Sequence, residues 1–268
     1  MEGVKTQVVV GAYALAAWFC LYLLITVGLR VWARTSSLSH AHRAHVTESF
    51  VSGVQGMACA LVGLMTVYSC RLDVMKEKFP LAVYYSSVGT AYFIYDFWAM
   101  YRSHVAGLDV GSAVMPSVVS YVRKDLLMII HHLTIIGLFL PALVYYSPMG
   151  DFFLGCFYCA ELSTPFVNAR VILSRLGYKD SKIYVVNGLL MMTVFAICRI
   201  ALFPIMYGIY LSQQTSAPSF IHALLTIPVT CHLSCLLVLA PQVYWLGVMV
   251  KGALVVMRPD STKAGKDD

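Results

Sequence analysis

Long apolar runs fill most of the chain and are separated by short polar connections. A helix needs about 20 apolar residues to cross about 30 Å of hydrocarbon. The pattern therefore predicts seven membrane spans, near residues 7–29, 47–70, 81–101, 125–146, 151–173, 183–211 and 219–250. The last two runs are longer than one bilayer and contain Pro204, Pro228 and Pro241, so we expect kinks, tilt or interfacial extensions there.

Composition supports the same class of protein. Hydrophobic residues make up 59% of the 268 residues and charged residues 12%, with a mean hydropathy of +0.75. Soluble domains carry about a quarter charged residues, so a soluble protein is excluded. The first run lacks a basic leader and is too long for a signal-peptide core, and we interpret it as a span. The chain is expected to be an all-α membrane protein, with one multi-span domain at 1–250 and a short polar tail at 251–268.

The basic residues indicate topology. The net charge is +6, but Lys and Arg lie in short loops between apolar runs rather than in one patch, so no nucleic-acid partner is expected. Connections that follow odd-numbered spans hold 14 basic residues, and the opposite side holds 4. Because basic loops stay cytosolic, the amino terminus is expected in the lumen or outside and the tail in the cytosol.

Few ionisable residues lie inside the predicted spans, where a charge is costly unless it is paired or faces a cavity. They are Asp96, His131, His132, Glu161, Arg199 and His232. Asp96 and His131 each lie roughly 9 Å from the cytosolic ends of their spans and could meet at one level. A carboxylate there can orient an imidazole for general-base chemistry. A structural hydrogen bond that neutralises both residues is equally consistent.

Adjacent helical residues point about 100° apart, so His131 and His132 cannot both face one point, although both can line a wide cavity. Metal ligation by this pair alone is not expected, because ligands on one helix face sit three or four residues apart. The loop histidines His40, His42 and His45 are interpreted as solvated. The motif formed by Cys156 and Cys159 lies inside a span, so packing is favoured over a redox role.

The stretch from Glu161 contains Pro165, which breaks the helix and leaves carbonyl groups that the Ser163 and Thr164 hydroxyls can reach. Estimated depths bring Glu161 and Arg199 within reach of each other, and a structural ion pair between the fifth and sixth spans is favoured for Arg199 over a substrate contact. The list of candidate substrate-binding residues is Ser163, Thr164, Asn168, Asn187 and Arg199. The two asparagines could bond between helices or to a lipid headgroup.

An ordered set of motifs resembles the TLC-domain proteins, a membrane family that includes the ceramide synthases, and most closely the third TLC-domain subfamily. The motifs are TyrPheIleTyrAsp at 92–96, HisHis at 131–132, GlyAspPhePheLeuGlyCys at 150–156, AlaGluLeuSerThrProPheVal at 160–167, ValAsnGly at 186–188, CysArgIle with LeuPhePro at 198–204, and AlaProGlnValTyrTrp at 240–245. The resemblance implies a TLC-type bundle, with its core at 40–250, around a lipid-sized cavity.

In ceramide synthases, the chemistry is acyl transfer from acyl-CoA to the amine of a sphingoid base. By position, the resemblance makes His131 and His132 candidate catalytic residues, as nucleophile or general base, with Asp96 and Glu161 beside them. No bound cofactor is expected, with acyl-CoA as co-substrate. Membrane lipids and a sphingoid base are the expected partners, and homo- or hetero-oligomers remain open. The implied location is the endoplasmic reticulum, with Golgi and plasma membrane as alternatives.

One departure from the family pattern leaves the activity open. Ceramide synthases carry a second motif that begins HisAsp, whereas the comparable stretch here reads AlaGluLeuSerThrPro. Glu161 could replace one carboxylate, but the histidine is missing. The alternative is a non-catalytic lipid-binding or lipid-regulatory membrane protein. A transporter is disfavoured because inverted repeats are not evident.

Overall fold

The computed structural model describes residues 2–32, 38–108, 114–145, 150–214 and 219–257. Every regular element in these ranges is helical. The elements are α1 (Glu2–Val31), α2 (His40–Ser69), α3 (Pro80–Ala106), α4 (Val114–Tyr145), α5 (Phe152–Cys159), η1 (Ala160–Ser163), α6 (Thr164–Arg175), α7 (Lys182–Phe195), η2 (Ala196–Ala201), α8 (Leu202–Gln214), α9 (Phe220–Thr226) and α10 (Val229–Met257).

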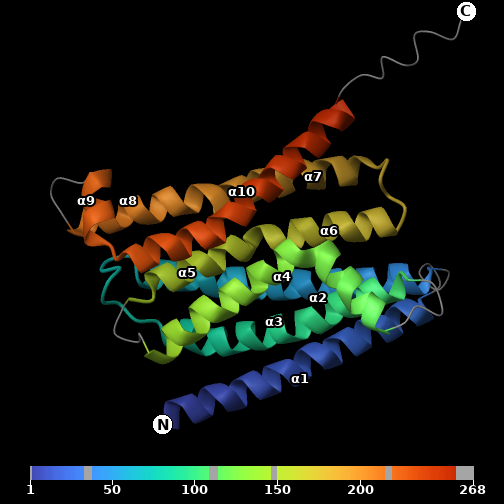
Figure 1. Cartoon of the computed structure of the whole chain (residues 1–268), viewed down its shortest axis with the longest axis horizontal. Helices are drawn as coiled ribbons and strands as arrows, with labels where there is room; N and C mark the ends of the chain where they lie inside the picture. Colours follow the sequence, from blue (N-terminus) through green and yellow to red (C-terminus); the bar gives the residue numbers. More distant parts are fainter. Residues whose placement is uncertain (1, 33–37, 109–113, 146–149, 215–218, 258–268) are drawn as a thin grey trace, which may run out of the picture.

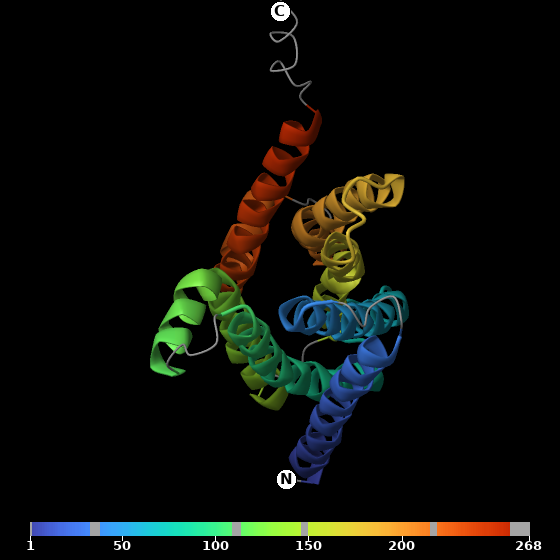
Figure 2. The same cartoon turned by 90° about the vertical axis from the view of Figure 1, so that its right-hand side faces the viewer.

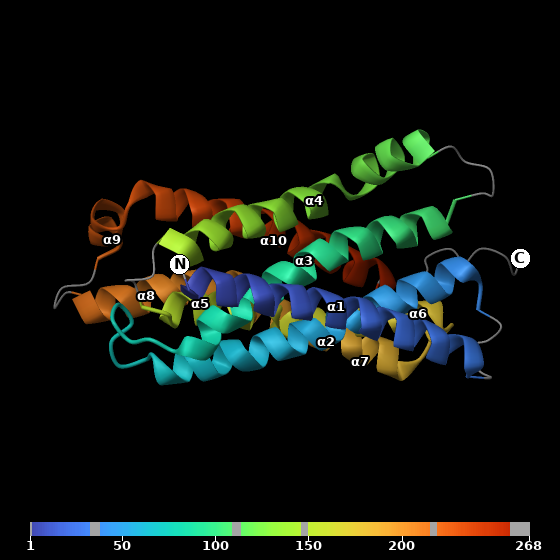
Figure 3. The same ribbon diagram turned by 90° about the horizontal axis from the view of Figure 1, so that it is seen from below.

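Because α5, η1 and α6 are continuous, as are α7, η2 and α8, the described elements form seven long helical rods and the short helix α9. The rods run side by side along the long axis of the molecule (Figures 1 and 3). Four helices in the described residues are long and apolar enough to cross a membrane, namely Lys5–Val31, His40–Ser69, Lys182–Gln214 and Val229–Leu254. The prediction of an all-α, multi-pass membrane protein is confirmed.

Helix boundaries differ from the predicted spans mainly in the fourth and seventh rods. Helix α4 begins at Val114, well before the predicted start at 125, and Asp125 has non-helical backbone angles (φ −111°, ψ 19°) that kink the helix there. Pro228 separates α9 from α10, as the sequence suggested. Helix α10 continues to Met257, and the expected tail beyond it, 258–268, lies outside the described residues.

Helix α2 lies at the centre of one half of the bundle and packs against α1, α3, α5 and α6. Small residues permit its close approach to α5. A Cβ atom on Gly63 would lie 2.6 Å from the backbone nitrogen of Cys159, and one on Gly155 would lie 2.8 Å from Cβ of Thr66. Small residues at helix contacts allow this close packing within membranes.

The other six rods close into a ring around the candidate site, with α1 outside it against α2 and α3 (Figure 2). Contacts run from α2 to α3, from α3 to α4, from α4 to α10 and from α10 to η2. The ring is completed where η2 meets η1 and where α5 and α6 meet α2. This closure brings polar residues from distant parts of the sequence to one interior.

Candidate functional site

Arg199 lies in a π-helical segment, η2, inside the sixth rod. Pro204 has no backbone N–H for the carbonyl four residues earlier, so an α-helix cannot continue unchanged across it. The chain adopts a wider turn, in which the Leu202 N–H donates to the Ile197 carbonyl, five residues before it. Such π-bulges are uncommon and often occur at functional sites.

The fifth rod has a complementary irregularity at the same level. Pro165 offers no N–H, and the N–H of Thr164 donates to the Glu161 carbonyl in a tight 3₁₀ turn instead of to that of Ala160. The Ala160 carbonyl therefore becomes available to side chains, as the proline motif predicted. It accepts a hydrogen bond from Nε of Arg199 at 3.0 Å.

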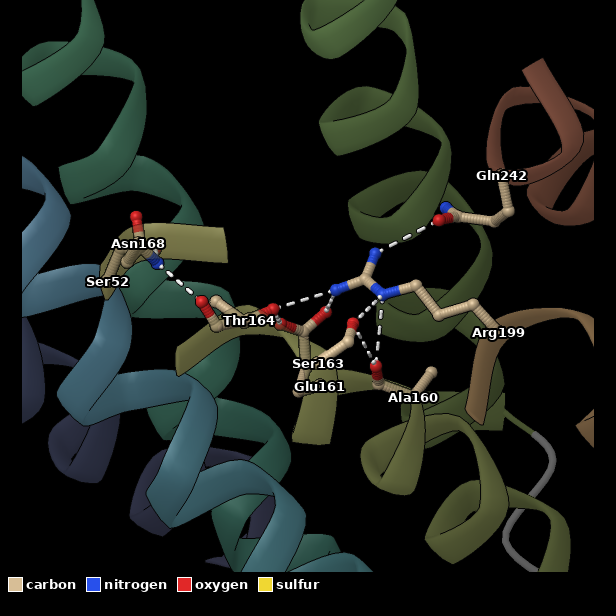
Figure 4. Close-up of polar contacts among 8 residues, drawn as sticks. All are labelled: Ser52, Ala160, Glu161, Ser163, Thr164, Asn168, Arg199 and Gln242. Atoms are coloured by element: carbon tan, nitrogen blue, oxygen red, sulfur yellow. Dashed lines mark hydrogen bonds and ion pairs between the residues drawn. The ribbon is translucent and has the colours of Figure 1, made fainter. Parts of the chain in front are cut away.

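The Arg199 guanidinium joins three rods through a dense polar network (Figure 4). Beyond the Ala160 carbonyl, it donates to Ser163 Oγ at 2.8 Å, Thr164 Oγ1 at 2.7 Å, Glu161 Oε1 at 3.2 Å and Gln242 Oε1 at 3.1 Å. The second oxygen of Glu161 accepts from the Thr164 hydroxyl at 2.5 Å. The predicted Glu161–Arg199 ion pair is present, and the side chains are only 21% and 11% exposed, respectively.

A pocket lies inside the ring, and Arg199, Glu161 and His131 line it together. Gln55 and Gln242 add further polar groups. The space between the lining atoms, its opening included, is about 830 Å³. Its apolar walls comprise Phe93, Ile135, Ile136, Phe157, Leu202, Phe203 and Val238. A mostly apolar pocket with a few polar groups is the usual form of a small-molecule site.

The two adjacent histidines of α4 have different surroundings. His131 is on the pocket wall, with its ring edge-on to Trp245 and 5.2 Å from it between centroids. His132 lies behind it, against the rings of Phe93 and Phe97.

Asp96 faces His132 rather than His131, so the predicted pairing of Asp96 with His131 is wrong. The Asp96 Oδ2 atom is 3.6 Å from His132 Nδ1, and Asp96 Oδ1 accepts a hydrogen bond from the Tyr92 hydroxyl at 2.9 Å. Asp96, His131 and His132 are all buried, with exposures of 7%, 6% and 7%, respectively. Depth along the helices was predicted correctly, but rotation about the α4 axis was not.

The two asparagines bond between helices. Asn168 Nδ2 donates to Ser52 Oγ at 2.9 Å, a contact also drawn in Figure 4, and to the Thr164 carbonyl at 3.1 Å. Asn187 Nδ2 donates to the Phe166 carbonyl at 2.9 Å. Of the two roles expected for the asparagines, bonding between helices and bonding to a lipid headgroup, these bonds correspond to the first. Substrate contacts by Asn168, Asn187, Ser163 and Thr164 stay predictions.

Sequence reasoning missed Gln242, which is 3% exposed and is the contact of α10 with the Arg199 network. The signal was present, because Gln242 is a polar residue directly after Pro241 inside an apolar run. Within the described ranges, no group of three or more His, Cys, Asp and Glu side chains is placed to hold a metal ion. All eight cysteines are free thiols.

These features define a multi-pass helical membrane protein with a polar cluster and a paired histidine site inside its bundle. The family model for the TLC domain matches residues 45–251, which is most of the chain. The chain therefore belongs to the TLC-domain family, as its motifs predicted. A membrane-lipid-associated role follows from this membership together with the apolar pocket.

Curated relatives align over part of their length. Human TLC domain-containing protein 4 is 38% identical over 99 residues, which cover 37% of this chain and 37% of that protein. TLC domain-containing protein 4-B of Xenopus laevis is 43% identical over 100 residues, covering 33% and 38%, respectively. The 4-B protein of Danio rerio is 30% identical over 134 residues, covering 50% of each. The chain thus spans half or less of these relatives, and no solved structure matches it.

Proposed function

We propose that this protein is a membrane acyltransferase of the ceramide-synthase type, which transfers an acyl chain from acyl-CoA to the amine of a sphingoid base. The observation that carries the proposal is the position of His131, whose imidazole shares a pocket wall with a fixed guanidinium. An imidazole can take a proton from an attacking amine, and a general base of this kind contributes about 10²- to 10⁴-fold to a rate. His132 and Asp96 lie behind His131 and would support it.

Arg199 would stabilise the negative charge that develops on the carbonyl oxygen. Its Nη1 atom carries two N–H groups and contacts one acceptor, Gln242 Oε1, among the described residues. The other four acceptors fix Nε and Nη2, so the remaining Nη1 donor is held in place before substrate arrives. Donors fixed in advance in a water-poor site are the most effective form of transition-state stabilisation.

The remaining parts of the proposal follow from the two substrates. The apolar walls formed by residues such as Phe157, Leu202 and Val238 would hold an acyl chain. The charged CoA headgroup cannot enter the bilayer, so it would stay at the cytosolic mouth, where Arg123 and Lys124 are exposed and can meet phosphates. Location in the endoplasmic reticulum, with a lumenal amino terminus, belongs to this proposal.

The test is acyl transfer by purified protein in detergent, with labelled acyl-CoA and a sphingoid base. The comparison is between wild type and His131→Ala, with His222→Ala on the exposed surface of α9 as matched control. All three proteins are first shown to melt at similar temperatures. Amide formed by wild type and by the control, but not by His131→Ala, supports the proposal. No amide from folded wild type across several chain lengths overturns it.

One observation favours a non-catalytic lipid-binding protein as the second candidate. Glu161 occupies the stretch where ceramide synthases carry the HisAsp motif, and both of its carboxylate oxygens already accept hydrogen bonds, from Arg199 and Thr164. A carboxylate engaged in this way is a structural partner rather than a free base. This candidate predicts that wild type binds acyl lipid without turnover, and that His131→Ala retains both the binding and the effect on cellular lipid levels.

A further inference from the structure

Buried polar atoms without partners are concentrated on one side of the site. Nine buried side-chain nitrogen or oxygen atoms have no hydrogen-bond partner among the described residues. Seven of them lie on α2, α3 or α4, in Glu48, Tyr95, Ser103, His104, Tyr121, His131 and His132. Native proteins leave few such groups unpaired, and a cluster of them indicates bound water.

These atoms extend from the site toward one end of the bundle. His131 and His132 are adjacent, with ring centroids 5.9 Å apart, and His132 faces Asp96. Glu48 of α2 interacts electrostatically with Asp96 and with Tyr95 of α3.

The line then reaches the end of the bundle where α2 begins and α3 ends. Tyr121 of α4 interacts electrostatically with Glu48 and packs on His104, with ring centroids 5.8 Å apart. Glu48 also faces His45, which is 24% exposed. His45 and His104 therefore mark this end of the line, where His45 is open to bulk water and His104 is 7% exposed. By the distribution of basic residues, this end is expected on the cytosolic side.

Two close pairs along the line are not joined by direct hydrogen bonds. His132 Nδ1 lies 3.6 Å from Asp96 Oδ2, and His45 Nδ1 lies 3.7 Å from Glu48 Oε2. Both separations exceed a normal hydrogen bond, so each group keeps bonding capacity that water beside the pair can satisfy. On its other side His131 lines the pocket, where the ionisable groups Glu161 and Arg199 are paired with each other.

We propose that this line is a hydrated proton exit, which connects His131 through His132, Asp96 and Glu48 to the end of the bundle marked by His45 and His104. The inference rests on the proposed acyl transfer. A sphingoid ammonium and an acyl thioester give an amide, a free thiol and one proton. The amine nitrogen forms the new C–N bond as the C–S bond breaks, the thiolate takes one proton, and the second proton must leave the site. Glu48 is a relay residue in this route and contacts neither substrate.

Hydration of the line can be measured without turnover. Hydroxyl-radical footprinting of the intact protein in lipid nanodiscs oxidises side chains beside bound water. Tyr95 is 0% exposed and Tyr121 is 7% exposed, and each has a buried hydroxyl without a hydrogen-bond partner. Phe152, at 2%, has no polar side-chain atom, lies in an apolar cluster at the other end of the bundle and is the dry control. Each rate is divided by that of the same residue in unfolded protein. We expect Tyr95 and Tyr121 to react at least several times faster than Phe152, and rates equal to that of Phe152 overturn the proposal.

The proton role is tested with Glu48→Gln, Glu48→Asp and the control Glu77→Gln, which lies in the loop at the opposite end. We expect Glu48→Gln to slow amide formation by about 10- to 100-fold, at or below the range for a direct proton-transfer group. Glu48→Asp should recover most of this loss, and Glu77→Gln should match wild type. Turnover of Glu48→Gln at the wild-type rate overturns the relay. If wild type forms no amide, the acyl-transfer proposal and the proton role fail together, and the footprint separately decides whether the line is hydrated.

Discussion

Replacing Arg199 with Met is the most informative test of the polar network. The change keeps a long side chain but removes every donor, so Glu161 is left without its cation and the acceptors on Ser163, Thr164 and Gln242 lose a partner. Breaking a buried ion pair by removing one partner costs about 3–5 kcal/mol. The side chain of Glu161 is 21% exposed, so we expect the lower end, about 3 kcal/mol.

The assay is thermal unfolding in detergent. A change of 1 kcal/mol shifts the melting temperature by roughly 2–4 °C for chains of about this size, so Arg199→Met should melt about 6–12 °C below wild type. Arg123→Met is the control, because Arg123 is exposed on α4. The double variant Glu161→Gln/Arg199→Met should recover part of the loss, since the uncompensated carboxylate is gone. A melting temperature for Arg199→Met within about 1–2 °C of the Arg123→Met control, well below the expected shift, would refute this reasoning.

Two further predictions follow from the packing and from the corrected histidine pairing. Gly63→Ala should destabilise the protein by about 1–3 kcal/mol in the same melting assay, because the new Cβ would lie 2.6 Å from the Cys159 nitrogen, whereas Gly208→Ala, with open space around it, should not. Asp96→Asn should slow amide formation less than His131→Ala does, because the carboxylate faces His132, and an equal loss in both variants would contradict that geometry.

The sequence predicted the rods and the level of the site because both depend on properties read along one helix. Apolar run length determines which segments can span a bilayer. The rise of 1.5 Å per residue placed Glu161 and Arg199 at one depth, and their ion pair is present in the structure. Pro165 also indicated the irregular turn that frees the Ala160 carbonyl.

The remaining geometry depends on how helices rotate and associate, which depth alone does not determine. One residue along a helix turns a side chain by about 100°, so the rotation of α4 about its axis decides whether His131 or His132 faces Asp96. The kink at Asp125 precedes both histidines on α4, and no neighbouring proline or glycine signals it. Gln242 reaches Arg199 only because α10 closes the ring against η2.

The most direct test of the central claim, that an acyl chain binds in the pocket beside His131, is photo-crosslinking with an acyl lipid that carries a diazirine in mid-chain. The account predicts labels on Phe157, Leu202 and Val238 that excess unlabelled lipid removes, and that Leu202→Trp, which fills the pocket, abolishes. Labels confined to outward-facing residues such as Leu24, which is 69% exposed, and unchanged by competitor would contradict it.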